Sequence, residues 1–187
     1  MRVHLPEEMQ ARPFENIGRQ YPTHIVHSAA IYGTAPYQHS TLSLRELEAA
    51  RYRTALINGC QTCTAFRGER DFPGLFAAFD GDVESSVWSH GPAPDELFYA
   101  QIENWRDWEG YSERERLAIQ YAEGMGLDPH GIAADEAFWT RAKAAFSDAE
   151  IVDMTYSIGA WMANGRALHV LGMDAVCSFA LPDRAAA

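Results

Sequence analysis

The stretch ELEAARYRTALINGCQTCTAFRG, residues 46–68, joins a helical pattern to two closely spaced cysteines. The helix that begins after Ser43 is expected to end near Gly59, because glycine is the usual residue just past a helix end. A second helix then begins at or near Cys60. Within it, Cys60 and Cys63 are three residues apart, so they share a face and lie within reach of a disulfide.

The position of these cysteines at a helix start favours a reactive thiol. The first turn of a helix carries free N–H groups and a partial positive charge, which together stabilise a thiolate. Arg67 follows Cys63 by four residues and Cys60 by seven. A continuous helix would place its guanidinium on the face of the cysteines. The sequence therefore predicts two thiols beside a fixed positive charge.

Two other interpretations of the CxxC spacing remain open. A structural zinc site needs four ligands, but no second cysteine pair and no ligand-like spacing of histidines follows. Two buried, unreactive cysteines on a helix are the other alternative. The glycine and the helix break just before Cys60 favour the redox interpretation. Cys177, in a distant apolar segment, is expected to stay out of the disulfide.

Helix signals dominate the chain after residue 40. Further helices are expected over 95–108 and 134–146, and no convincing alternation typical of a strand occurs. Three capping boxes of the S-x-x-E type mark helix starts at Ser43 with Glu46, Ser112 with Glu115, and Ser147 with Glu150. The sequence predicts an all-α protein, a helical bundle of about seven or eight helices.

The chain is expected to have one domain and an N-terminal arm. Prolines and glycine recur along residues 1–40, which are predicted to be irregular and to wrap a neighbouring surface. Residues 41–187 are expected to form a single all-α domain. A length of 187 residues is enough for a sizeable core.

Composition restricts the partners of the chain. Its net charge of −11, from 26 acidic and 15 basic residues, repels phosphate backbones and argues against nucleic-acid binding. The sequence has no apolar run of signal-peptide or membrane-spanning type, so no membrane association is expected. Three cysteines without a signal suggest the reducing cytoplasm, where a disulfide would be transient and functional.

Residues 46–68, 111–125 and 146–173 together resemble the carboxymuconolactone decarboxylase and alkylhydroperoxidase D-like family. The family pattern is a glutamate, about a dozen residues, then C-x-x-C-x-x-x-H. The resemblance covers roughly residues 40–175 and implies the alkylhydroperoxidase D-like helical bundle. It also implies a homo-oligomer, a trimer, dimer or hexamer, and an enzyme that needs no cofactor and no metal.

The resemblance also implies roles for single residues. Cys63 would be the thiol that attacks a peroxide, and Cys60 the thiol that resolves the product. Glu48 occupies the position of a carboxylate that takes part in proton relay to the cysteines; the alternative is a residue on a charged helix surface. Arg67 departs from the family, which has a relay histidine there, and Thr62 stands where some peroxidases carry another histidine.

Arg67 cannot take over the proton relay, because a guanidinium stays protonated at any ordinary pH. It could lower the pKa of a thiol by its charge or bind the carboxylate of an anionic substrate. Alternatively, Arg67 could pair with Glu48 or another acid and only join two helices. His169 and Tyr121 are polar residues in apolar helices; each could line a pocket, although such residues are more often core groups.

Three hypotheses about function follow. The preferred one is a thiol–disulfide oxidoreductase of peroxidase type, with catalytic Cys60, Cys63, Glu48 and Arg67, acting on a small hydroperoxide or related molecule with an unidentified thiol reductant. The alternative is a decarboxylase, lyase or isomerase in which Glu48 and Arg67 handle an anionic small molecule. The third, a non-catalytic helical assembly module, has no positive support in the sequence.

Overall fold

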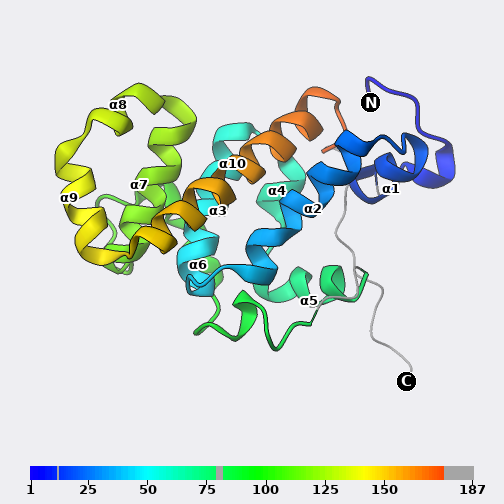
Figure 1. Cartoon of the computed structure of the whole chain (residues 1–187). Coiled ribbons are helices and arrows are strands. Elements are labelled where there is room, and N and C mark those ends of the chain that lie inside the picture. Colours follow the sequence, from blue (N-terminus) through cyan, green and yellow to red (C-terminus); the bar gives the residue numbers. More distant parts are fainter. Residues whose placement is uncertain (12, 79–81, 175–187) are drawn as a thin grey trace.

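The computed structural model describes residues 1–11, 13–78 and 82–174, and within these ranges every regular element is helical (Figure 1). The α-helices are α1 Pro13–Gln20, α2 His24–His39, α3 Leu44–Asn58, α4 Gln61–Ala65, α5 Gly68–Ala78, α6 Glu96–Ala100, α7 Glu113–Leu127, α8 Pro129–Ala134, α9 Glu136–Ala145 and α10 Asp148–Val170. Three 3-10 turns complete them: η1 Glu7–Met9, η2 Val87–Ser89 and η3 Ile102–Asn104. The predicted all-α class is confirmed, with ten α-helices in the described ranges.

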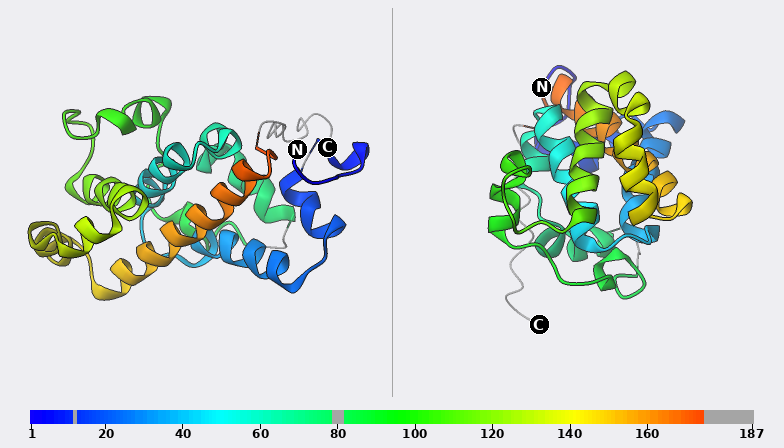
Figure 2. Two further views of the ribbon diagram at one scale, coloured as in Figure 1. Left: turned by 90° about the horizontal axis from the view of Figure 1, so that it is seen from above. Right: turned by 90° about the vertical axis from the view of Figure 1, so that its left-hand side faces the viewer.

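Helix α3 lies at the centre of the bundle. It packs against α7 on one side and α10 on the other, and α2 covers α10. Figures 1 and 2 show α7, α8 and α9 gathered at one end of the molecule and α1 at the other, with α10 running between them. The core is fully buried around Leu47 and Ala50 of α3, Ile119 of α7 and Ile158 of α10. The functional stretch of the sequence therefore begins in the best-packed helix.

The three predicted capping boxes are confirmed. In each, the serine side chain accepts the N–H of the glutamate three residues later, and that glutamate accepts the N–H of the serine. This arrangement satisfies two N–H groups that a helix start leaves unpaired. At the end of α3, Gly59 has φ +65°, a left-handed conformation that residues with a Cβ rarely adopt. The chain can therefore reverse directly into α4.

The prediction of irregular structure over residues 1–40 is wrong for most of that segment. Helices α1 and α2 occupy it, and the Thr23 side chain caps α2 by accepting the N–H of Val26. The prolines misled the sequence prediction because they fall at helix ends: Pro13 begins α1, and Pro36 lies in the last turn of α2, where few helical hydrogen bonds are lost.

Helix α2 is an integral part of the bundle. The hydroxyl of Tyr32 donates to the carbonyl of Tyr156, and Nδ2 of Asn164 donates to the carbonyl of Ala29. A Cβ on Gly33 would lie only 2.7 Å from Nδ2 of Asn164, so the absence of a side chain there allows α2 to approach α10. These contacts place α2 on the same region of α10 that faces the cysteines.

The helix expected over 95–108 is shorter than predicted. Helix α6 ends at Ala100, and only the turn η3 follows. The guanidinium of Arg116 donates to the carbonyl groups of Trp105 and Trp108, near the end of the predicted span. In the described ranges no helix combines the length and apolarity that crossing a bilayer would require.

Candidate functional site

Cys60 and Cys63 are joined by a disulfide at the start of α4, as their spacing predicts. Their Cα atoms are 5.2 Å apart, within the usual range for a disulfide. Cys60 is the residue before the first turn of α4, and its Sγ accepts the N–H of Cys63 at 3.3 Å. Cys177 lies outside the described residues.

The two cysteines differ in their exposure. Cys60 is completely buried, in an apolar cluster with Leu5, Leu168 and Met173. Cys63 is only half-buried and lines a cavity. A molecule in that cavity can therefore meet the sulfur-bearing side chain of Cys63, whereas Cys60 lies behind it.

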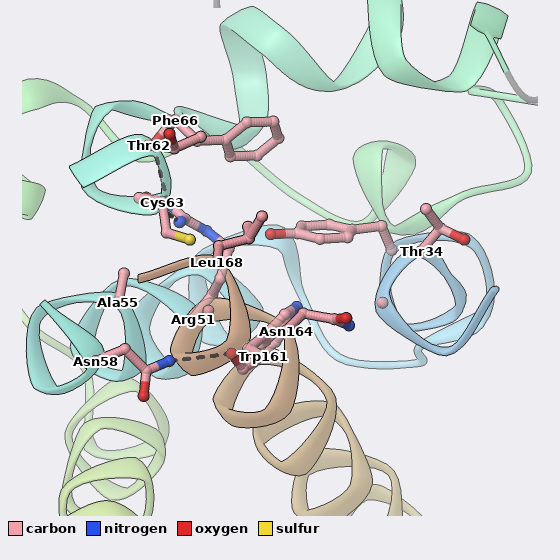
Figure 3. A pocket seen from close by; sticks show the side chains of 13 residues that line it. Thr34, Arg51, Ala55, Asn58, Thr62, Cys63, Phe66, Trp161, Asn164 and Leu168 are labelled. Atoms are coloured by element: carbon pink, nitrogen blue, oxygen red, sulfur yellow. Dashed lines mark hydrogen bonds between the residues drawn. The ribbon is translucent and has the colours of Figure 1, made fainter. Parts of the chain in front are cut away.

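The cavity has a volume of about 110 Å³ and lies between α2, α3, α4 and α10 (Figure 3). Apolar groups form most of its lining, including Tyr37, Ala55, Phe66, Trp161 and Leu168. Figure 3 shows Cys63 and Phe66 on one side of it and Asn58 and Trp161 on the opposite side. Largely apolar pockets with a few polar groups are typical sites for small molecules.

A buried ion pair lies beside the cavity. Nε of Arg51 contacts Oε1 of Glu48 at 2.5 Å, and Nη2 contacts Oε2 at 2.9 Å. Glu48 is fully buried, and Arg51 is 4% exposed. Oε2 of Glu48 also accepts the hydroxyl of Tyr99 at 2.6 Å and the N–H of Gly68 at 3.1 Å. The alternative in which Glu48 is a surface residue is therefore wrong.

Arg51 links this ion pair to the cysteine segment. Its Nη1 donates to the carbonyl of Cys63 at 2.7 Å, and its Nη2 donates to the carbonyl of Phe66 at 3.0 Å. Burial acts to lower the pKa of Arg51, but the adjacent Glu48 carboxylate outweighs burial and raises that pKa further above its ordinary value. The guanidinium is thus a permanent cation that neutralises Glu48.

Two tyrosines complete the buried cluster. Burial raises the pKa of Tyr37 well above its ordinary value, and the charge of Glu48 adds to that rise. Burial and Glu48 likewise raise the pKa of Tyr99. Both phenols therefore remain protonated at neutral pH. Tyr37 also packs against Phe66 and Trp161, so it connects the cluster to the wall of the cavity.

Arg67 is not placed as the sequence analysis expected. Helix α4 ends at Ala65, so Arg67 does not continue the face that carries the cysteines. Its Nε and Nη2 contact the carboxylate of Glu96 at 2.9 and 3.1 Å, and its guanidinium lies over the ring of Tyr99. Arg67 therefore pairs with Glu96 and not with Glu48, and it is not among the described residues that line the cavity.

Arg51 is the residue that the sequence analysis missed. Its three-residue spacing from Glu48 in a helix otherwise rich in alanine and leucine was the available signal, because such a pair can form an ion pair. What the sequence could not give is the tertiary contact with the carbonyl of Cys63. Of the expected site residues, the structure brings Cys60, Cys63 and Glu48 together around Arg51.

His169 and Tyr121 have different surroundings. Nδ1 of His169 contacts Oδ2 of Asp174 at 2.9 Å, and the same oxygen accepts the N–H of Gln61 at the start of α4. The ring of His169 packs against Gly59. Tyr121 pairs with Thr155 near α9, away from the cysteines. His169 thus holds Asp174, which in turn accepts the N–H of Gln61 at the start of α4. Tyr121 is a core residue.

In the part of the chain that the structure describes, no group of three or more histidine, cysteine, aspartate or glutamate side chains is arranged to hold a metal ion.

Comparison with known proteins supports the fold. No protein-family model matches the chain, and no curated protein matches it in sequence. Among solved structures, it is similar to a protein of unknown function from Agrobacterium tumefaciens, described as a candidate antioxidant defence protein, AhpD. The two are 22% identical, with a TM-score of 0.61 over 84% of this chain and 93% of the other. This similarity shows a shared helical fold.

Proposed function

We propose that this chain is a thiol–disulfide oxidoreductase of peroxidase type, and that Cys60 and Cys63 are its reacting pair. The observation that carries the proposal is the disulfide between a buried Cys60 and a half-buried Cys63 that lines an apolar cavity. A redox pair needs one sulfur that meets the substrate and one that waits within bonding distance. The AhpD-like description of the similar bacterial protein supports the same chemistry.

In the proposed reaction, the Cys63 thiolate attacks the terminal oxygen of a hydroperoxide, ROOH. The O–O bond breaks, Cys63 becomes a sulfenic acid, and the leaving alkoxide takes up a proton to give ROH. The Cys60 thiol then attacks the sulfenic sulfur, which forms the disulfide and releases water. A dithiol reductant restores both thiols and is itself oxidised to a disulfide.

Arg51 has a positioning role in this proposal. Its Nη1 donates to the Cys63 carbonyl and so fixes the main chain of the cysteine that lines the cavity. The free N–H groups and partial positive charge of the first turn of α4 are what favour a thiolate there. Glu48 acts through Arg51, which it holds in place. Tyr37, whose phenol lines the cavity and is protonated, is a candidate to donate a proton to the leaving alkoxide.

The lyase alternative has less support from the geometry. It assigned Glu48 and Arg67 to an anionic substrate. Glu48 is neutralised by Arg51, and Arg67 pairs with Glu96 outside the described cavity lining. Arg51 is the one arginine or lysine among the described lining residues, and its charge is already paired with that of Glu48. An anionic substrate would therefore find no unpaired cation there.

The test is a single-turnover assay on the reduced protein. Mixed with tert-butyl hydroperoxide, the protein is expected to consume about one equivalent of peroxide, while mass spectrometry shows loss of two hydrogens from the peptide with Cys60 and Cys63. Cys63→Ser is expected to abolish consumption, Cys60→Ser to stop at a sulfenic acid, and the control Cys177→Ser to behave as the unaltered chain. Full consumption by Cys63→Ser would contradict the proposal.

A further inference from the structure

Two unpaired polar atoms belong to residues that line the cavity beside Cys63. Nε1 of Trp161 and Oδ1 of Asn58 are buried and have no hydrogen-bond partner in the part of the chain that the structure describes. Buried polar groups are almost always paired, because leaving one unpaired forfeits its hydrogen bond to water. Two such atoms at one cavity point to a missing partner that the protein does not supply.

The other polar side chains around the cavity are already engaged within the protein. The hydroxyl of Thr34 donates to a carbonyl of α2, that of Thr62 to the carbonyl of Asp174, and Nδ2 of Asn164 to the carbonyl of Ala29. Arg51 is held by Glu48 and by main-chain carbonyls. Among the described lining residues, the buried side-chain atoms without a partner are those of Trp161 and Asn58.

Asn58 and Trp161 are neighbours with a fixed relation. Nδ2 of Asn58 donates to the main-chain carbonyl of Trp161 at 3.0 Å, and this bond determines which atom of the amide remains unpaired (Figure 3). The pair thus leaves one donor unpaired, the indole N–H, and one acceptor, the amide oxygen, which points away from Cys63 in Figure 3. A Cβ on Gly165 would lie 2.5 Å from Nδ2 of Asn58, so the bare main chain of α10 is what lets the amide sit there.

The charge of the cavity restricts what can enter. Arg51 is the one permanently charged side chain among the described lining residues, and Glu48 neutralises it. A carboxylate or an ammonium group would lose its hydration without gaining an unpaired counter-ion. An uncharged molecule loses much less hydration free energy on entering the cavity.

We propose that this cavity binds an uncharged organic molecule of about four carbons. Its apolar body would contact Ala55, Phe66 and Leu168, and its polar end would accept a hydrogen bond from the indole N–H of Trp161. The size follows from the volume of about 110 Å³, since an apolar cavity of about 150 Å³ takes benzene. The proposal deepens the proposed function by naming a substrate class for Cys63, and it rests on that function only for the reaction that follows binding.

The experiment uses the full ¹⁵N-labelled chain in its disulfide form at pH 7 and four probes with the same carbon chain length. These are 1-butanol, butanamide, butanoate and butylammonium. The indole N–H resonance of Trp161, identified by its absence in Trp161→Phe, reports directly on a new acceptor. We expect 1-butanol and butanamide to shift this resonance with saturation, and butanoate and butylammonium to bind at least about tenfold more weakly.

Trp161→Phe keeps an aromatic ring and removes the donor, so it is expected to weaken 1-butanol binding about threefold to tenfold. Binding to this variant, and to the unaltered chain for comparison, is followed by the main-chain N–H resonances of the lining residues Ala55 and Leu168. Trp139→Phe is the matched control, because Nε1 of Trp139 already donates to the carbonyl of Ile132 and Trp139 is not among the described lining residues. That variant is expected to bind 1-butanol as the unaltered chain does, as followed by the Trp161 resonance.

Three results would overturn the proposal. The first is the absence of saturable 1-butanol binding at the Trp161 resonance, the second is butanoate binding as tightly as 1-butanol, and the third is unchanged binding in Trp161→Phe. The first two need no variant, so they remain decisive if Trp161→Phe does not fold. None of these measurements depends on peroxide turnover, so failure of this proposal and failure of the redox function are separate outcomes.

Discussion

Nη1 of Arg51 lies 2.7 Å from the carbonyl oxygen of Cys63, so a cation from α3 holds the main chain of the cysteine that faces the cavity. The same guanidinium is paired with the fully buried carboxylate of Glu48. Helix α3 therefore contributes more than the chain reversal that presents the cysteines. It also supplies the charge and the hydrogen bonds that position Cys63.

The cysteine pair is expected to form a reversible disulfide without Cys177. The three-residue spacing and the 5.2 Å separation of the Cα atoms allow Cys60 and Cys63 to open and close without a large movement of α4. Thiol counting and peptide mapping before and after mild oxidation will check this. Loss of Cys177 reactivity while Cys60 and Cys63 remain free would contradict it.

Removing Arg51 is expected to destabilise the fold strongly. Arg51→Met keeps much of the side-chain volume but leaves Glu48 as an unpaired buried charge, at a cost of about 3–5 kcal/mol in the free energy of unfolding. The double variant Glu48→Gln with Arg51→Met is expected to lose less than the sum of the single losses, because the two residues act on each other. Urea unfolding of the two single variants and the double variant measures the coupling energy between Glu48 and Arg51. A loss in the double variant equal to the sum of the two single losses would contradict the prediction.

Arg67→Gln is expected to have little effect on the peroxide reaction, because Arg67 is not among the described lining residues. It is expected to reduce stability mainly through the lost hydrogen bonds to the carbonyls of Thr64 and Phe66, since the ion pair with Glu96, whose side chain is 72% exposed, contributes only about 0–1 kcal/mol. Urea unfolding and single-turnover peroxide consumption provide the two readouts, with a predicted change below about twofold in rate. A rate loss of a hundredfold, the scale of acid–base catalysis, would instead return Arg67 to the site.

The support of α4 by Asp174 is expected to weaken in acid. Burial acts to raise the pKa of Asp174, but the hydrogen bonds from His169 and the N–H of Gln61 outweigh it and lower that pKa. A carboxyl whose pKa is lowered in the folded state stabilises the protein above its unfolded pKa of about 4. That contribution disappears as the pH falls through the lower folded value.

Asp174→Asn tests this directly. The variant is expected to be less stable than the unaltered chain at pH 6 and to lose less stability on going from pH 5 to pH 3. Urea unfolding at these three pH values measures both differences. An identical pH dependence in the two proteins would show that Asp174 does not contribute in this way.

The chain is expected to form a homo-oligomer through α2 and α10. Ile31 of α2 is 56% exposed and Tyr156 of α10 is 65% exposed, although both are large apolar side chains, and the two helices pack side by side. Light scattering is expected to give a multiple of the 20.9 kDa chain mass at micromolar concentration. Ile31→Glu with Tyr156→Glu should reduce that mass, and a monomer for the unaltered chain would rule the prediction out.

Local signals in the sequence were enough for much of the fold. Each capping box consists of hydrogen bonds between a serine and a glutamate only three residues apart. Gly59 ends α3 because glycine readily adopts the left-handed backbone conformation found there. Both are therefore readable without tertiary information. The N-terminal helices were missed because Pro13 and Pro36 were read as helix breakers, whereas their places at helix ends are compatible with α1 and α2.

The site was less predictable, because its decisive contacts are tertiary. Cys60, Cys63 and Glu48 could be selected from the sequence, but Arg67 was expected on the face of a helix that in fact ends at Ala65. Arg51 contacts a carbonyl 12 residues away, and the cavity needs side chains from four helices. No local sequence pattern predicts contacts between residues so far apart in the chain.

The unequal burial of the two sulfur-bearing residues gives thiol exchange a direction. An incoming thiolate can approach Cys63 from the cavity side, whereas Cys60 is enclosed by apolar side chains. In the proposed reaction, the mixed disulfide with a reductant would therefore form on Cys63, with Cys60 as the departing thiol. With Cys60 replaced by serine there is no internal disulfide to open. An incoming thiol would then meet the sulfenic acid of Cys63 directly, form the mixed disulfide with release of water, and leave the second thiol of a dithiol reductant to open it.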